Sequence, residues 1–218
     1  MTFDDIKNNE EVKGLIETAD RNLCALGYTE HAFAHCTKVS HEAFRILDEL
    51  GYPEHEKELA GIAGYLHDIG NAINRSRHAE YGAILAKSIL DGTDMALADK
   101  LTVMSAIANH DESTGGANDV ISAALIIADK TDVRRNRVRN KAKAQFDIHD
   151  RVNYAVCESS LSVDSIKKEI SLNLTVDEEI CTMYDYFDIF LGRMMMCRKA
   201  SEILGCIFRL YVNGRKVL

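Results

Sequence analysis

The residues best suited to chemistry in this chain are an adjacent histidine and aspartate, His67 and Asp68, at the end of an apolar run. The run covers residues 59–66, and Gly70 follows as a helix stop signal. Neighbouring side chains on a helix point about 100° apart, so both can face one ion only where the backbone turns at a helix end. Imidazole nitrogen beside carboxylate oxygen suits zinc, iron, manganese and similar divalent ions. The doublet alone fits a helix cap with a solvated imidazole equally well.

Further candidate ligands occur at expected helix ends or on apolar faces elsewhere in the chain. They are His35, His78, His110 and Asp129. Each has an ordinary interpretation on its own, such as a hydrogen-bonded core histidine or a carboxylate paired with a nearby lysine or arginine. Together they lie on separate expected helices, and the cores of helix bundles are where inward-pointing histidines and carboxylates build metal sites. The joint pattern therefore favours a metal site.

Composition restricts the class of protein further. The chain has 218 residues, enough for a substantial core, and a single proline leaves long stretches free to be helical. A formal charge of −8 argues against general nucleic-acid or membrane-surface binding. We find no secretory signal and no apolar run long enough to cross a bilayer, and the six cysteines form no Cys-x-x-Cys pair. These features predict a cytoplasmic protein with no membrane contact.

Hydrophobic periodicity predicts which elements carry the candidate ligands. A spacing of 3.6 residues predicts helices over residues 2–27, 29–51, 54–68, 76–92, 93–110 and 120–139. Beyond residue 151 the apolar residues alternate, at Val152, Tyr154 and Val156 and again over 170–176, which predicts an antiparallel hairpin. A last long helix is expected from about residue 177 to 212. The predicted fold is mainly α: a helical bundle over residues 1–147, and a hairpin-plus-helix extension over 148–218 packed on it.

The order of the candidate ligands resembles that of the HD-domain superfamily of metal-dependent phosphohydrolases, over about residues 28–140. In that family a histidine, a His-Asp doublet and a distant aspartate bind the metal, and the matching residues here are His35, His67-Asp68 and Asp129. Members with two metals add two histidines between the doublet and the last aspartate, which His78 and His110 match in order and context. Asp111 stands where the cyclic-di-nucleotide phosphodiesterase branch carries a second histidine, so that activity is not implied.

The resemblance implies one or two divalent cations, drawn from Fe, Mn, Zn, Ni and Mg. With two, Asp68 would bridge them, His35, His67 and Asp129 would complete the first site, and His78 and His110 the second. Asp68 and His67 are then the expected catalytic residues. The implied activity is hydrolysis of a nucleotide or other small phosphoester by a metal-bound hydroxide.

A local basic cluster supplies the expected substrate contacts in this otherwise acidic chain. Arg75, Lys130 and Arg134 are predicted to bind phosphate, because guanidinium and ammonium groups suit its oxygens, whereas Arg137 and Arg139 are expected on a solvated face. Two other functions fit the same ligand pattern: a di-iron oxygenase of the same fold, and a non-catalytic regulatory or binding module. A homodimer formed through the C-terminal extension is a further expectation.

Overall fold

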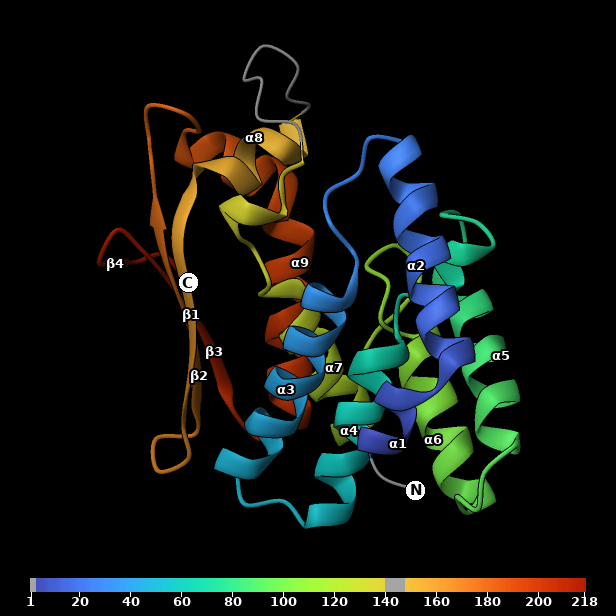
Figure 1. Ribbon diagram of the computed structural model, residues 1–218. Coiled ribbons are helices and arrows are strands. Elements are labelled where there is room, and N and C mark those ends of the chain that lie inside the picture. The colour runs from blue at the N-terminus through green and yellow to red at the C-terminus, as the bar shows by residue number, and fades with distance from the viewer. Residues whose placement is uncertain (1–2, 140–147) are drawn as a thin grey trace.

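The computed structural model describes residues 3–139 and 148–218, and Figure 1 shows a group of helices beside a small twisted sheet. All the regular elements of residues 3–139 are helical, as the spacing of the apolar residues predicts. Its elements are α1 (Phe3–Asn8), α2 (Glu10–Ala25), α3 (Phe33–Glu49), α4 (Glu54–Leu66), the 3₁₀ turn η1 (Ile69–Ala72), α5 (His78–Asp91), α6 (Leu97–Ala108), α7 (Val120–Lys130) and the 3₁₀ turn η2 (Arg135–Arg137). The expected first helix is two helices, because the Asn9 side chain accepts hydrogen bonds from the backbone N–H groups of Glu11 and Val12 and caps α2.

Helix α7 is the centre of the fold. Its residues from Ile121 to Ala128 are all buried, so it is apolar around its whole circumference, as expected of a helix enclosed by others. It packs against α3 and α4 on one side and against the C-terminal helix α9 (Met183–Ile203) on another. Asp119 and Ser122 cap its N-terminus reciprocally. Residues at the C-terminal end of α7 are therefore held deep inside the molecule.

The C-terminal part adds a helix and a four-stranded sheet to the bundle. Its elements are α8 (Ile148–Ala155), β1 (Val156–Asp164), β2 (Glu169–Val176), α9, β3 (Ile207–Val212) and β4 (Arg215–Lys216). The strand order is β1-β2-β3-β4, with an antiparallel β1–β2 hairpin and a parallel β2–β3 pair that α9 connects. Apolar residues of β2 pair with apolar residues of β3, including Leu172 with Leu210, and these side chains are buried. Figure 1 shows α9 between this sheet and the helical bundle.

Three of the expected boundaries are wrong. The sixth predicted helix stops at Lys130 rather than near residue 139, because the chain turns there to bring Asp132 inward. Val152 and Tyr154 lie on the short helix α8 rather than on a strand. The last helix ends at Ile203, where Gly205 at φ +66° forms a Schellman turn, and the residues that follow form β3.

The division of the chain at residue 147 falls at the edge of residues 140–147, which lie outside the described part. Side chains on both sides of it, such as Leu125 and Phe190, belong to one hydrophobic core. The two-part organisation and the expected homodimer stay predictions. Among the described residues, every helix is too short or too polar to cross a membrane.

Candidate metal centre

The His-Asp doublet lies where α4 ends and the chain turns into η1. His67 caps α4, and its Nδ1 lies 2.8 Å from the carbonyl oxygen of Gly64. Asp68 precedes the 3₁₀ turn, and its Oδ1 accepts a hydrogen bond of 2.9 Å from the Asn71 side chain. Gly70 packs so closely on the start of α5 that an added Cβ would lie 2.0 Å from the His78 carbonyl oxygen. This turn directs both side chains of the doublet inward, as the sequence predicts, and fixes where α5 begins.

One set of ligand atoms gathers on the side of Asp68 that faces α3 and α7. The Nε2 atom of His35 lies 3.3 Å from Nε2 of His67, 3.6 Å from Oδ2 of Asp68 and 3.4 Å from Oδ1 of Asp129. Nε2 of His67 lies 3.4 Å from the same Asp68 oxygen and 3.6 Å from the same Asp129 oxygen. Ligands about 2.1 Å from one ion are separated by roughly 3 to 4 Å. The ligand atoms of His35, His67 and Asp129 lie within 4.8 Å of one another, so these three side chains have the spacing that a single cation requires, and an oxygen of Asp68 lies beside both histidines.

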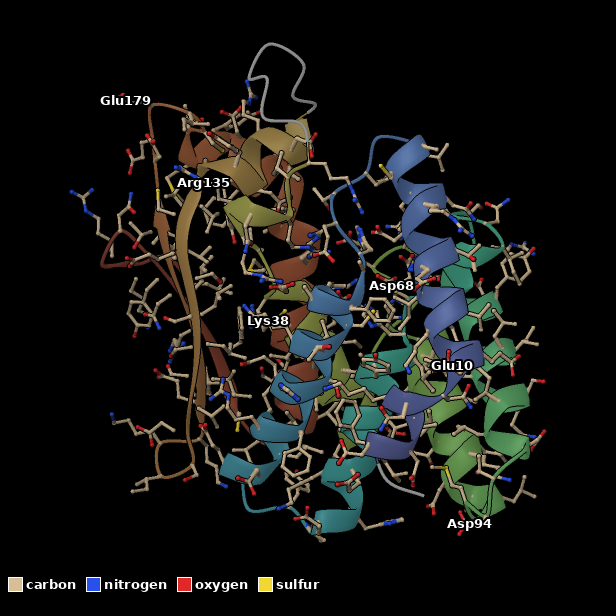
Figure 2. All side chains as sticks on the ribbon, viewed as in Figure 1. Glu10, Lys38, Asp68, Asp94, Arg135 and Glu179 are labelled. Atoms are coloured by element: carbon tan, nitrogen blue, oxygen red, sulfur yellow. The ribbon has the colours of Figure 1, made fainter. Side chains whose placement is uncertain are left out.

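A second set lies on the other side of the same carboxylate. Nε2 of His78 is 3.2 Å from Nε2 of His110, and these atoms lie 3.6 and 4.0 Å from Oδ1 of Asp68. Asp111 points toward this group, with its Oδ1 3.9 Å from His78 Nε2, while its Oδ2 accepts hydrogen bonds from Ser113. Asp68 therefore offers one oxygen to each set. In Figure 2 it lies inside the helical part, whereas Glu10 and Asp94 lie on the outside.

All four imidazoles are held in the same way, through the nitrogen that faces away from the centre. Nδ1 of His67, His78 and His110 lies 2.7–3.2 Å from a backbone carbonyl oxygen, and Nδ1 of His35 lies 2.8 Å from Oδ2 of Asp132. A neutral imidazole that donates through Nδ1 keeps a lone pair on Nε2, and this is the usual arrangement of a metal-binding histidine. The donor set therefore fits divalent cations in chemistry as well as in spacing.

The charge balance of the centre calls for added positive charge. Burial acts to raise the pKa of Asp68, but the neighbouring imidazoles outweigh it and hold the pKa well below its usual range. Burial acts in the opposite sense on His67, and the carboxylates of Asp68 and Asp129 prevail, which raises the pKa of His67 to about 10. For His110, burial dominates and lowers the pKa to about 3. The first set thus holds two ionised carboxylates. Lys130 pairs with Asp129 at 2.7 Å, and a proton on His67 or a bound cation balances the other.

Asp132 is a candidate site residue that the sequence analysis missed. It is fully buried, and besides His35 it contacts Lys38 at 3.2 Å and Arg134 at 2.5 and 2.9 Å. Burial raises the pKa of a carboxyl, but the hydrogen bond to His35 and the nearby Arg137 hold the pKa of Asp132 far below its ordinary value. It lies three residues after Asp129, just beyond the end of α7, and both carboxylates face His35, but no local sequence pattern indicates that contact.

The predicted substrate contacts are only partly brought together. Arg75 and Lys130 line a cavity beside Asp68, His78 and His110. Arg134 does not line that cavity, because its guanidinium is bound to Asp132. Arg137 was expected on a solvated face, but it is buried, lines the cavity and donates to the backbone oxygens of Glu30 and Asp132. The remaining lining includes Tyr28, His31, Glu112 and Arg193.

Comparison with known proteins agrees with this arrangement. The family model of the HD domain matches residues 32–152, which is more than half of the chain. The chain belongs to the HD domain family. The resemblance seen in the sequence is confirmed, together with the mainly helical fold. HD domains bind divalent metals, and members of the superfamily are typically metal-dependent hydrolases.

Individual relatives of this HD protein are distant. An uncharacterised protein of Methanocaldococcus jannaschii is 26% identical over 204 residues, which cover 82% of this chain and 77% of that protein. Ribonuclease Y of Deinococcus radiodurans is 28% identical and that of Thermus thermophilus 27% identical, each over 136 residues. The match covers 61% of this chain but only 22% of either ribonuclease. A solved structure, of a predicted HD superfamily hydrolase from an uncultured Thermotogales bacterium, is 23% identical to this chain, with a TM-score of 0.45. The match covers 57% of this chain and 67% of the chain in that structure.

Proposed function

We propose that this HD protein is a phosphohydrolase that uses two divalent cations and acts on a nucleotide or another small phosphoester. The observation that carries the proposal is the position of Asp68. Its Oδ2 lies beside His35 and His67, and its Oδ1 lies beside His78 and His110. A carboxylate with one oxygen toward each of two ligand sets is the arrangement that holds two ions at bridging distance.

Each side chain has a distinct role in this proposal. His35, His67 and Asp129 would hold the first ion, His78 and His110 the second, and Asp68 both. When bound, such ions generate a nucleophile at neutral pH and neutralise charge on the phosphoryl oxygens. Asp68 fixes the relative position of the two sites, because Asn71 and the tight turn at Gly70 hold it from behind. His67 and Asp68 are the proposed catalytic residues, since they define where the reacting group lies.

The cavity beside the centre suits a phosphorylated substrate. Lys130 is 2.7 Å from Oδ2 of Asp129 and almost completely buried, so its ammonium group is fixed at the edge of the first site. Arg75 lies over the Tyr28 ring at 5.3 Å and lines the same cavity. Cationic groups beside the centre suit the anionic oxygens of a phosphoester, and this lining supports hydrolysis. The ribonuclease Y relatives support phosphodiesters as candidates alongside phosphomonoesters.

Hydrolysis assays on the metal-loaded protein would test the proposal. The purified chain is supplied in turn with manganese, iron, nickel, zinc and magnesium, and assayed against nucleotides, p-nitrophenyl phosphate and bis-p-nitrophenyl phosphate. We expect at least one ester to be hydrolysed, Asp68→Ala to abolish the activity, and the exposed carboxylate variant Asp188→Ala to retain it. Absence of hydrolysis with every metal, or full activity of Asp68→Ala, would refute the proposal. Oxygen consumption by the iron-loaded protein, without hydrolysis of any ester, would favour the oxygenase.

A further inference from the structure

The cavity beside the metal centre is completed by a residue from outside the matched HD region. The family match ends at residue 152, whereas Arg193 lies on α9 and lines the same cavity as Asp68, His78 and His110. Helix α9 reaches the centre because it packs directly on α7, which carries Asp129 and Lys130. The C-terminal part of the chain therefore shapes the cavity as well as covering the bundle.

The Arg193 guanidinium is held in a defined position by two contacts. Its Cζ lies over the ring of the fully buried Phe190, 4.5 Å from the centroid, and its Nε lies 3.3 Å from Oε1 of Glu112. Glu112 follows His110 by two residues, so this contact ties Arg193 to the loop that carries a ligand of the second set. Within the described part of the chain, no partner occupies the two terminal nitrogens, and the side chain is 23% exposed. A rigid guanidinium with both terminal nitrogens free is suited to bidentate binding of a phosphate.

The other cationic groups of the cavity contact residues at or beside the metal centre. Lys130 is bound to Asp129, and Arg137 is bound to backbone oxygens of Glu30 and Asp132. Arg75 is bound weakly, at 3.3 Å, to Asn71, close to the doublet. Arg193 differs from them because it comes from α9 and its partner, Glu112, is not a proposed metal ligand.

We propose that Arg193 is a specificity-determining residue that binds a second phosphate of the substrate, away from the phosphoryl group at the metal centre. The substrate class is accordingly a phosphoester that carries two phosphate groups, such as a nucleoside diphosphate or bisphosphate. This inference rests on the proposed phosphohydrolase function. A substrate with one phosphate satisfies the centre but leaves Arg193 paired only with Glu112.

Binding measurements on the manganese-loaded chain test this assignment, with the phosphate released during each titration measured so that binding is separated from turnover. Adenosine 5′-monophosphate is the single-phosphate probe, and ADP and adenosine 3′,5′-bisphosphate are the two-phosphate probes, each titrated by calorimetry. We expect at least one two-phosphate probe to bind about tenfold or more tightly than the monophosphate. Arg193→Ala and the milder Arg193→Gln should reduce that ratio to about one, while affinity for the monophosphate stays within about twofold.

Two further variants separate phosphate binding from a structural tie between α9 and the loop. Arg198→Ala, an exposed arginine on the same helix that pairs with Glu202, should keep the wild-type ratio. Glu112→Gln breaks the ion pair but leaves the guanidinium, so this variant should also keep the preference for two-phosphate probes. If it loses that preference as fully as Arg193→Ala does, the role of Arg193 is structural and the assignment is overturned. Equal affinity of the wild type for all three probes would overturn it too. If the protein hydrolyses phosphoesters and binds the monophosphate, but Arg193→Ala does not change the preference for two-phosphate probes, this inference alone is refuted. If no probe binds, the proposed function is refuted as well.

Discussion

Replacing Asp132 by asparagine should weaken the first cation site without removing any of its proposed ligands. Oδ2 of Asp132 accepts from His35 Nδ1 at 2.8 Å and from Arg134 at 2.9 Å, while Oδ1 accepts from Arg134 at 2.5 Å. Asparagine has one acceptor oxygen. If that oxygen stands at the Oδ2 position, His35 keeps its acceptor and the amide NH2 group faces Lys38 and Arg134 Nε; if it stands at the Oδ1 position, His35 loses its acceptor. If His35 loses it, neither the tautomer nor the orientation that directs Nε2 at the ion is fixed any longer.

The size of the expected loss in metal affinity depends on the cationic side chains that remain around residue 132. Loss of the partner behind a metal-binding histidine typically costs about 10- to 100-fold in metal affinity, or roughly 1.4 to 2.8 kcal/mol. We expect the upper end of that range, because Lys38, Arg134 and Arg137 surround the Asp132 carboxylate at 3.2, 2.5 and 3.6 Å. Without the buried charge, these three cations oppose the binding of a further cation nearby.

The assay is a competition titration of manganese against a chromophoric chelator at neutral pH, with thermal unfolding of the metal-free protein as a check on folding. Asp99→Asn is the matched control, since Asp99 also pairs with a histidine, His55, at 2.9 Å but near the surface. The control should bind manganese as the wild type does. Equal affinity of folded Asp132→Asn and wild-type protein would refute the role assigned to Asp132.

Three other perturbations test the structure around the site. Arg134→Ala should leave KM nearly unchanged and lower metal affinity by about threefold to tenfold, measured in the same titration, because this guanidinium supports a buried carboxylate and does not line the cavity. Gly70→Ala should cost more than about 3 kcal/mol in urea unfolding, because its Cβ would meet the His78 carbonyl oxygen at 2.0 Å, whereas Gly14→Ala, with open space around it, should be neutral or stabilising. Burial raises the pKa of Tyr65 to about 12, so the folded state keeps a proton that the unfolded chain releases above about pH 10. The free energy of unfolding, measured in urea at each pH, should therefore fall between pH 10 and 12, and it should fall less in Tyr65→Phe.

Much of the site could be predicted because it depends on short-range patterns. The stop signal at Gly70 after an apolar run placed His67 and Asp68 at a helix end, and the structure has them there. The same reasoning could not find Asp132, because its partner His35 lies 97 residues away and only the end of α7 brings them together. The contact of Arg134 with Asp132 could not be anticipated for the same reason.

The C-terminal part was harder to predict because local patterns there fit more than one element. Val152, Tyr154 and Val156 alternate as a strand would, yet the first two lie on α8. The run from Ile207 to Val212 continues the apolar content of the preceding helix, and only Gly205 marks the break. The parallel pairing of β3 with β2 has no local signal, because it depends on the path of α9.

The metal content of the saturated and desalted protein tests the central claim most directly. If Asp68 bridges two sites, mass spectrometry of the metal should give about two ions per chain for the wild type and about one for His78→Ala. Asp68→Ala, which removes a ligand from both sites, should retain less than either. One ion per chain in the wild type, unchanged in His78→Ala, would contradict the account and reduce His78 and His110 to histidines at helix ends.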